Sequence, residues 1–471
     1  MSLITAHTPL ERSLRAGGFR GELIDANHPE YEEARRVWSG TIDRRPLAIA
    51  RCRDTEDVAS AVKLASEQKL PLAIRCGGHS AAGHSTCDGG LVIDLSPIHH
   101  VVVDPQTRRA CVGGGALLGQ LDQAAQQHGL AVPAGQVSHT GVGGLTLGGG
   151  VGYLMRQLGL TIDSLIAVEL VTAAGETVRA HEQTNEDLFW ALRGGGGNFG
   201  VVTEFEFRLH VVGPLITAGV LVFPFERAKE IRQASRELMA QASKELSIHE
   251  ILINIPSHDP FPPALQGQPA VFLVPAHLGT PEEAATELAP LRALEPILDM
   301  VGPMPYVALQ TMIDWDTRHG LGTYTKSHWL RGFDDELIDT MIDLFPQAPS
   351  PLAHIITSRM GGAIENVPAG ATAFAHRDAA NLMWVIDLWD DLEEDIEPHR
   401  TWVNGLLAAT ARHSTGVYVN ALEADELAAR TQSAYDGPTF ERLRQVKRRW
   451  DPDNLFQLNA NIPPAGTDKH P

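Results

Sequence analysis

The sequence predicts an α+β fold of two domains, and three features of the pattern support this prediction. Short strand patterns alternate with helix patterns up to about residue 210, and glycine-rich turns separate them. Beyond about residue 212 these turns nearly vanish, prolines become more frequent and amphipathic helix patterns appear. We therefore expect one domain over residues 1–212, a second over residues 213–414, and a separate C-terminal segment over residues 415–471.

The first domain is expected to combine a clearly marked helix with several strands. Asp54 begins a capping sequence, after which Val58 and Val62 recur at helical spacing. The strands are short apolar or alternating runs that end at turn residues. They cover residues 72–74, 91–95, 100–103, 166–172 and 200–209.

The rest of the chain is expected to carry longer amphipathic helices, at residues 226–242, 281–294 and 439–449. Apolar strand patterns lie between the first two helices and after them, at residues 271–274 and 383–388. The last helix ends in a short basic run that acidic residues follow, so we expect a solvated helix end there. This run is Lys447, Arg448 and Arg449.

The composition excludes several classes of protein. The 471 residues include 58 acidic and 38 basic side chains, a formal charge of −20, which repels nucleic acid and anionic lipid. No apolar run approaches the roughly 18 residues of a membrane helix, and the N-terminus has no signal-peptide pattern. The four cysteines all lie in the first quarter of the chain, which favours a reducing, cytoplasmic location over a disulfide-stapled secreted protein.

A glycine pair directly after the strand at residues 72–74 predicts a binding loop. Gly77 and Gly78 allow backbone conformations that expose N–H groups to an anion, and Arg75 adds positive charge beside them. This loop could therefore hold a pyrophosphate group. His79 follows at its edge, where a neutral imidazole nitrogen could attack an electrophilic carbon of a cofactor. Taken alone, a histidine here would more often be structural.

Two further glycine-rich segments point to the same kind of site. Residues 135–152 contain so many glycines that the backbone is expected to approach another group closely. The apolar residues Val142, Leu145 and Leu147 between them argue against a flexible linker. Residues 187–203 predict a helix that ends on glycine and re-enters a strand, so a tight structural reversal explains them as well as a ligand does.

Two other sites have partial signatures. Residues 112–119 follow a strand and open a helix, as in a nicotinamide dinucleotide site, but no acidic residue ends the next apolar run to bind the ribose. Cys76, His79, His84 and Cys87 have a zinc-like order, but the gap between the two pairs is far too short for a zinc finger.

Four segments together resemble the berberine-bridge-enzyme-like branch of the vanillyl-alcohol oxidase family, whose members have a p-cresol-methylhydroxylase-type (PCMH-type) FAD-binding fold. These segments are residues 75–80, 133–152, 187–203 and the C-terminal motif 451–462. Residues 38–46 also resemble bacterial members, among them 6-hydroxynicotine oxidases and the enterocin favorskiiase. The resemblance extends from about residue 20 to 464, and it is loose between residues 213 and 350.

The resemblance implies a PCMH-type FAD-binding fold of two domains. Residues 1–212 and 415–471 would form a discontinuous FAD-binding domain, and residues 213–414 a substrate domain with an antiparallel sheet covered by helices. The flavin 8α-methyl carbon would be attached to His79. Many relatives carry a second link through a cysteine at the position of Val137, so we expect attachment through His79 alone.

The residues expected to bind FAD lie in the glycine-rich segments and in the C-terminal segment, and no metal ion is expected. They are Arg75, Cys76, Gly77, Gly78, His79, Ser80, Gly83, His84, Gly135, Val137, Ser138, Thr140, Gly143, Gly144, Gly148, Gly149, Gly150, Gly152, Val202, Tyr418, Asn420, Asn459 and Asn461.

The resemblance also implies where the chemistry occurs. Thr140 would lie beside the oxygen-reactive face of the flavin, with Tyr418 and Asn420 near its ring. Ala421 stands where many relatives carry a catalytic tyrosine, and Asn366 where plant members carry a glutamate base; the preceding Glu365, expected on a strand, is left unassigned. The identity of the catalytic base is therefore left open. The candidates are Tyr418 and three residues that could equally be part of the pocket wall. These are Tyr153, His139 and Tyr324.

We expect an FAD-dependent oxidase, in which a small organic substrate transfers hydride to flavin N5 and O2 reoxidises the flavin. The substrate could be an alcohol, an amine, a sugar or a natural-product intermediate, because the segment 213–414 carries no readable motif. Alternatives are a dehydrogenase with another electron acceptor, a flavin-N5-oxide-type oxygenase, and a binding protein that kept the fold. The expected partners are this substrate and O2, with the chain as a monomer or homodimer.

Overall fold

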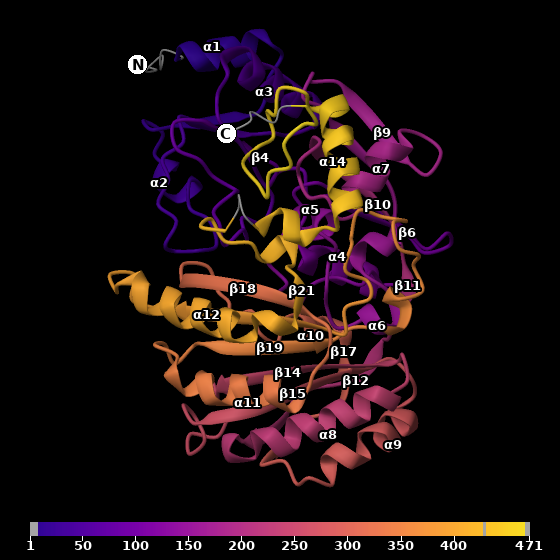
Figure 1. Cartoon of the computed structure of the whole chain (residues 1–471). Helices are drawn as coiled ribbons and strands as arrows, with labels where there is room; N and C mark the ends of the chain where they lie inside the picture. Colours follow the sequence, from indigo (N-terminus) through magenta and orange to yellow (C-terminus); the bar gives the residue numbers. More distant parts are fainter. Residues whose placement is uncertain (1–7, 427–429, 467–471) are drawn as a thin grey trace.

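The computed structural model of the chain describes residues 8–426 and 430–466 and confirms an α+β fold. Figure 1 shows two halves stacked on one another, the first built from the N-terminal residues and the second from the middle of the chain. The yellow C-terminal segment crosses back and lies against the N-terminal half. Within the described residues, no helix combines the length and apolar character needed to cross a lipid bilayer.

A four-stranded sheet begins the N-terminal half, in the order β1-β2-β4-β3. Strands β2, β3 and β4 are parallel, and β1 pairs with β2 in the antiparallel direction. Helix α3 connects β2 to β3, and the Asp54 side chain accepts a hydrogen bond from the N–H of Asp57 as predicted. The bounds are α1 (Pro9–Ala16), β1 (Glu22–Asp25), α2 (Tyr31–Ala34), β2 (Ala48–Arg51), α3 (Thr55–Gln68), β3 (Leu72–Arg75) and β4 (Leu91–Asp94).

A five-stranded antiparallel sheet follows, in the order β5-β6-β10-β8-β9. Because β6 pairs antiparallel with both β5 and β10, the turn after it is not part of a parallel dinucleotide-binding unit. Helix α5 lies inside the glycine-rich segment, where the sequence did not predict a helix. The bounds are β5 (Val101–Asp104), β6 (Arg109–Gly113), α4 (Leu118–Gln126), β7 (Leu130–Ala131), α5 (Val142–Leu147), α6 (Met155–Leu158), β8 (Leu165–Val171), β9 (Thr177–His181), α7 (Glu186–Leu192), β10 (Val201–Arg208) and β11 (His210–Val211).

The second half is built on a ten-stranded antiparallel sheet whose main path is β16-β13-β15-β14-β19-β20-β18-β21. Strand β12 pairs with β15 and β17 beside this path. The bounds of the strands are β12 (Leu215–Ala218), β13 (Leu221–Pro224), β14 (Leu246–Asn254), β15 (Pro269–His277), β16 (Leu298–Asp299), β17 (Gly302–Pro305), β18 (Gly322–Leu330), β19 (His354–Arg359), β20 (Asn381–Trp389) and β21 (Ser414–Gly416).

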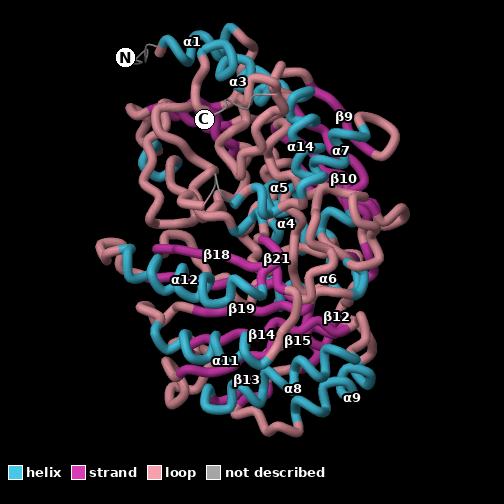
Figure 2. Tube along the Cα trace, viewed as in Figure 1, coloured by secondary structure: helices cyan, strands magenta, loops and turns pink. Residues whose placement is uncertain are grey.

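Helices cover one face of this large sheet, and Figures 1 and 2 show α8, α11 and α12 side by side across it. Ile355 and Val385 on that face belong to one buried cluster with helix residues such as Ile231 and Leu337. On the opposite face, β13 and β15 pack against Tyr306 and Leu309, whereas β18, β19 and β20 leave side chains open to a site. The helix bounds are α8 (Ala228–Gln241), α9 (Pro281–Arg292), α10 (Tyr306–Gln310), α11 (Asp335–Leu344) and α12 (Ile396–Thr410).

Short 3₁₀ helices complete the connections between these elements. They are η1 (Thr161–Ser164), η2 (Phe225–Arg227), η3 (Phe345–Gln347), η4 (Gly362–Ile364), η5 (Ala411–His413), η6 (Val419–Ala421) and η7 (Gln432–Ala434).

The C-terminal helix α14 (Gly437–Trp450) packs against α7, and its basic end differs from the prediction. Arg448 and Arg449 are exposed as expected, but Lys447 is fully buried. Its ammonium group donates 2.7 Å hydrogen bonds to the Asp451 carboxylate and to the Asn198 carbonyl. The four-residue spacing of Lys447 and Asp451 is visible in the sequence, but the burial of the pair depends on how the chain after the helix folds back.

We predict that Lys447→Met destabilises the fold by about 3–5 kcal/mol, because it leaves the carboxylate of Asp451 buried without its cation. The measurement is the free energy of unfolding in denaturant. The matched control in the same helix is Arg448→Met at an exposed position, expected to change that free energy by less than about 0.5 kcal/mol. Equal effects of the two substitutions would contradict the role given to Lys447.

Candidate functional site

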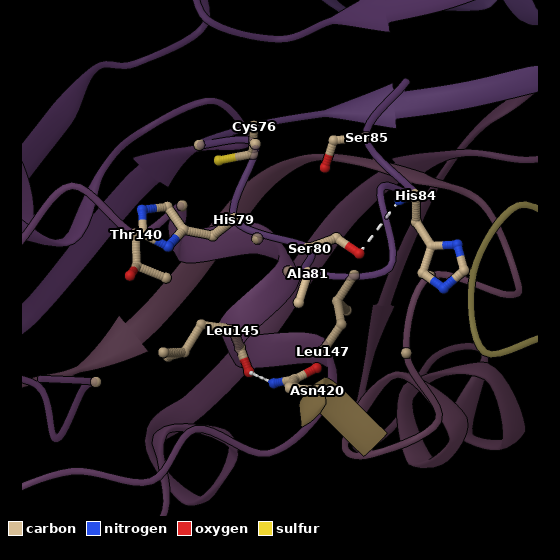
Figure 3. Close-up of a pocket in the computed structure, with 18 of the residues that line it drawn as sticks. Cys76, His79, Ser80, Ala81, His84, Ser85, Thr140, Leu145, Leu147 and Asn420 are labelled. Atoms are coloured by element: carbon tan, nitrogen blue, oxygen red, sulfur yellow. Dashed lines mark hydrogen bonds between the residues drawn. The ribbon is translucent and has the colours of Figure 1, made fainter. Parts of the chain in front are cut away.

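A cavity of about 410 Å³ lies between the glycine-rich loops and the free face of the ten-stranded sheet. Figure 3 shows part of its lining, with His79 beside Thr140 on one side and Ser80, Ala81, Leu147 and Asn420 farther along the wall. The volume is within the range of small-molecule and cofactor sites.

Two of the glycine-rich loops meet so closely that only glycine fits at the contact. A Cβ atom added at Gly77 would lie 2.4 Å from the backbone nitrogen of Gly141, and a Cβ added at Gly141 would lie 2.4 Å from that of Gly77. Any side chain at either position would push the loops apart. This contact therefore sets the wall from which His79 and Thr140 both face the cavity.

Other glycines leave space inside the cavity. Gly144 and Gly197 line it, and a Cβ atom at either position would meet no atom within 4 Å. Three polar atoms of lining side chains are also buried without a hydrogen-bond partner, so a bound group could satisfy them. They are Oγ1 of Thr325, Oδ1 of Asn459 and Nε2 of His84.

The lining carries no permanent charge. Among the described residues that line the cavity, none is Asp, Glu, Lys or Arg. Arg75, expected to face an anion, instead donates a 2.7 Å hydrogen bond to Asp94 and does not line the cavity. Negative charge on a ligand would therefore be met by backbone N–H groups of the glycine-rich loops.

His79 is held in a defined position on this wall. Its ring stacks on Trp38, with centroids 4.9 Å apart and planes at 16°. Its Nε2 atom lies 2.6 Å from Nδ1 of His139. Burial, and then the neighbouring imidazoles of His139 and His319, hold the pKa of His79 well below its ordinary value. The imidazole is therefore neutral at neutral pH, the form with a nucleophilic nitrogen.

Tyr418 and Asn420 also line the cavity and are bonded to each other. The Tyr418 hydroxyl accepts 3.0 Å hydrogen bonds from the Gly150 N–H and from Nδ2 of Asn420. Burial raises the pKa of Tyr418 to about 12, although these two bonds oppose the rise. The hydroxyl is therefore protonated at neutral pH, and it can donate its own hydrogen.

Alternate residues of three central strands form the opposite wall, and sequence reasoning did not identify them. Strand residues face alternate sides of a sheet, so every second side chain of β19 and β20 points to the cavity. The pattern was not readable because the strands 322–330 and 354–359 were not predicted. The wall comprises Thr325, His354, Ile356, Ser358, Trp384, Ile386 and Leu388.

His354 is the ionisable group on this wall. Its Nδ1 is 3.0 Å from the carbonyl oxygen of Leu352, and a carbonyl can only accept, so Nδ1 carries the hydrogen. Nε2 then holds the lone pair. Burial lowers the pKa of His354 below its ordinary value, so this side chain is a neutral proton acceptor at neutral pH.

Two lining residues, Ser358 and Gln136, meet the His249 side chain behind the wall. Ser358 Oγ is 2.5 Å from Nδ1 of the buried His249, and Nε2 of Gln136 lies 2.9 Å from the same nitrogen. Sequence reasoning missed these residues as well, because they come from segments more than one hundred positions apart.

Fifteen of the residues expected to contact the cofactor line the cavity: Cys76, Gly77, Gly78, His79, Ser80, His84, Gly135, Val137, Thr140, Gly143, Gly144, Val202, Tyr418, Asn420 and Asn459. The others lie behind the wall. Gly148 and Gly152, for example, are needed for close packing, since an added Cβ would strike Asn420 at 2.1 Å or the Ala134 carbonyl at 1.8 Å. Those outside the lining are Arg75, Gly83, Ser138, Gly148, Gly149, Gly150, Gly152 and Asn461.

Several residues considered as the base do not reach the cavity. Tyr153 is buried and packs on His249, with ring centroids 5.0 Å apart. Tyr324 is on the helix-covered face and donates a 2.6 Å hydrogen bond to Asp425. His139 lies behind His79 and is outside the lining. Asn366 is exposed after η4, and Glu365 does not lie on the strand expected for it.

The histidines of this region form a cluster of their own. Within the described part of the chain, one group of three side chains brings potential metal ligands within 4.8 Å of each other, and it consists of His79, His139 and His319. No three members of the zinc-like set Cys76, His79, His84 and Cys87 meet in this way. All four cysteines are free thiols.

Two family models match the segments of the chain that form this site. A family model described as "FAD binding domain" matches residues 46–181, and one described as "Berberine and berberine like" matches residues 417–463. Together the two models cover the glycine loops around His79 and the segment with Tyr418 and Asn420.

Relatives match along nearly the whole chain. An FAD-linked oxidoreductase of Dictyostelium discoideum is 30% identical over 448 residues, covering 94% of this chain and 95% of that protein. The (R)-6-hydroxynicotine oxidase of Paenarthrobacter nicotinovorans is 29% identical, covering 95% of this chain and 98% of that enzyme.

Solved structures share the fold. The 6-hydroxy-D-nicotine oxidase of Arthrobacter nicotinovorans superposes with a TM-score of 0.85 at 26% identity, over 97% of this chain and 99% of that one. The xylooligosaccharide oxidase of Myceliophthora thermophila, solved with xylobiose, gives 0.84 at 25% identity, over 97% of this chain and 100% of that one. The chain is therefore an FAD-linked oxidoreductase that belongs to the berberine-bridge-enzyme-like branch of the vanillyl-alcohol oxidase family.

Proposed function

We propose that this protein is an oxidase that carries FAD covalently on His79, oxidises a small and largely apolar substrate, and passes the electrons to O2. The observation that carries the proposal is the neutral His79 imidazole, fixed between Trp38 and His139 on the wall of a glycine-lined cavity. A surface histidine in a loop would have neither the fixed ring nor the adjoining cavity.

The residues present fit the FAD group. The open positions at Gly144 and Gly197 give it room, and the unpartnered polar atoms of Asn459 and His84 offer it hydrogen bonds. Bound there, the flavin supplies a hydride acceptor that O2 can reoxidise. We further propose that residues 1–212 and 415–471 hold this group and that residues 213–414 supply the substrate side.

The wall facing the flavin position favours a substrate with an apolar body. Ile356, Trp384, Ile386 and Leu388 supply most of its residues, beside the polar Thr325, His354 and Ser358, and it carries no Asp, Glu, Lys or Arg. A sugar chain would leave most of its hydroxyl groups without partners there. Among the relatives, an enzyme named for 6-hydroxynicotine therefore fits this wall better than one named for xylooligosaccharides.

The protonation states of the two candidate bases differ. Tyr418 holds its proton at neutral pH and can only donate a hydrogen bond to substrate or flavin. His354 is neutral with a free lone pair on Nε2, so we propose that it accepts the substrate proton as hydride leaves the neighbouring carbon. Thr140, beside His79 on the same wall, is proposed to shape the place where O2 reacts.

We predict that a screen of aromatic amines and alcohols finds compounds that bleach the yellow protein anaerobically. Admitting O2 should restore the colour and release one H2O2 for each flavin, because the proposed electron acceptor is O2. Stopped-flow absorbance measures the reoxidation. Reoxidation slower than seconds, with rapid reoxidation by an added quinone, would instead identify a dehydrogenase.

We predict that Gly144→Val prevents flavin binding without harming the fold, because Gly144 lines the cavity and a Cβ atom there would meet no protein atom within 4 Å. The measurements are bound FAD per chain and the melting temperature of the flavin-free protein. Gly405→Val is the control, since Gly405 also has no neighbour within 4 Å but lies on exposed α12. A Gly144→Val protein that binds FAD normally would refute the placement of FAD in the cavity beside Gly144.

We predict that His354→Gln slows flavin reduction by about 100-fold or more, the usual range for a lost general base. In the wild type, the reduction rate should stay constant from neutral pH downward and fall only in acid, because burial lowers the pKa of His354 and the neutral form is active. Tyr418→Phe removes a hydroxyl that accepts hydrogen bonds from Gly150 and Asn420 and can donate one, but it removes no base, so it should slow reduction less and leave this profile in place. A larger loss in Tyr418→Phe would make Tyr418 the base.

A further inference from the structure

Three imidazole rings lead from the cavity wall to the protein surface. His79 follows β3, His139 precedes α5, and the exposed His319 precedes β18, so three distant segments supply them. The ring centroids are 4.7 Å apart between His79 and His139, and 5.1 Å apart between His139 and His319. No step of the proposed substrate oxidation uses His139 or His319.

The contact between the first two rings fixes which nitrogen of His79 is available. His79 Nε2 and His139 Nδ1 are 2.6 Å apart, so one proton is shared between them. The stacking of Trp38 on His79 restrains rotation of the ring. Trp38 is itself tied by a 2.6 Å hydrogen bond from its Nε1 to the Thr317 carbonyl, in the loop that carries His319. Nδ1 is therefore the nitrogen of His79 that remains for a bond to another group.

A neutral imidazole carries a single N–H, so the position of the shared proton decides whether Nδ1 can react. With the hydrogen on Nε2 and donated to His139, Nδ1 has a lone pair. With the hydrogen on Nδ1, that nitrogen has no free lone pair and is not nucleophilic. A base at His139 that accepts the Nε2 hydrogen therefore both selects the reactive tautomer and removes the proton once Nδ1 has formed its bond.

No carboxylate competes for this role. None lines the cavity within the described residues, and Asp314, in the same loop as His319, already accepts hydrogen bonds from the backbone N–H and Oγ of Ser138, at 2.9 and 2.5 Å. The Nε2 atom of His139 is buried without a partner on the side away from His79. His319 is the exposed imidazole nearest to it and offers a route for the proton to solvent.

We propose that His139 is the proton acceptor for flavin attachment and directs the link to Nδ1 of His79, with His319 passing the proton to solvent. This proposal rests on the proposed covalent link. In the balanced step the Nδ1–C8α bond forms and a C8α–H bond breaks. The Nε2 hydrogen goes to His139 as a proton, the C8α hydrogen leaves as a proton that the flavin ring takes up, and the two electrons of the C–H bond reduce that ring. O2 then takes these two electrons with two protons and becomes H2O2.

The test measures attachment, which needs no substrate. Full-length protein is made without flavin in riboflavin-starved cells and mixed with FAD and O2. Samples taken over time are precipitated with acid, and flavin retained by the precipitate is counted as covalent. In wild-type protein the flavin should become covalent. In His139→Ala the same FAD should bind but become covalent about 100-fold more slowly or worse, and added imidazole should restore part of the rate.

Matched variants separate this role from a structural one. His100→Ala, an exposed histidine outside the cavity, should attach flavin at the wild-type rate, and His319→Ala should slow attachment less than His139→Ala. If His139→Ala fails to bind FAD, His139→Asn is used, because its amide oxygen can accept the hydrogen bond but cannot take the proton. Slow attachment in that variant supports the proposal, and the wild-type rate overturns it.

The results also distinguish the role proposed for His139 from the proposed covalent link between FAD and His79. If wild-type protein releases all its flavin in acid, the covalent link itself is wrong. If wild-type and His139→Ala proteins attach flavin equally fast, the link stands and the role of His139 is overturned. In a flavopeptide from protein labelled with ¹⁵N-histidine, the 8α protons should couple to Nδ1, and coupling to Nε2 would also overturn it.

Discussion

The backbone contact between Gly77 and Gly141 is the constraint on which the site depends. Side chains at these positions would separate two loops that come from different parts of the N-terminal half, after β3 and before α5. Because the loops touch, Nε2 of His79 in the first loop lies 2.6 Å from Nδ1 of His139 in the second. The same contact aligns the glycines that leave room for a planar cofactor. Removing this contact would therefore disturb both the position of His79 and the shape of the cavity.

The lack of charge inside the cavity gives its ionisable groups their states. Burial is the largest cause of the pKa shift in each group, and it favours the neutral form, whether acid or base. The pKa of His79 and that of His354 are both lowered, and the pKa of Tyr418 is raised. One environment thus produces a neutral nucleophile, a neutral proton acceptor and a protonated donor.

The sequence predicted the loops of the site better than its opposite wall. Glycines that allow close approach, as at Gly77, impose a local requirement that is visible in a single chain. The residues of β19 and β20 face the cavity only because of strand pairing across many positions, so His354 and Ile356 could not be identified. Helix α5 was missed because a run of glycines has low helix propensity, which the surrounding packing overrides. The burial of Lys447 depends on Asp451 and on carbonyls brought to it by the fold.

The covalent bond between His79 and the flavin is the central claim, and intact mass spectrometry of the denatured protein tests it most directly. The account predicts a mass increase of one FAD per chain that survives denaturation, located on the peptide containing His79 and absent from His79→Ala. An unmodified mass for wild-type protein that was yellow before denaturation, or a modified peptide without His79, would contradict it.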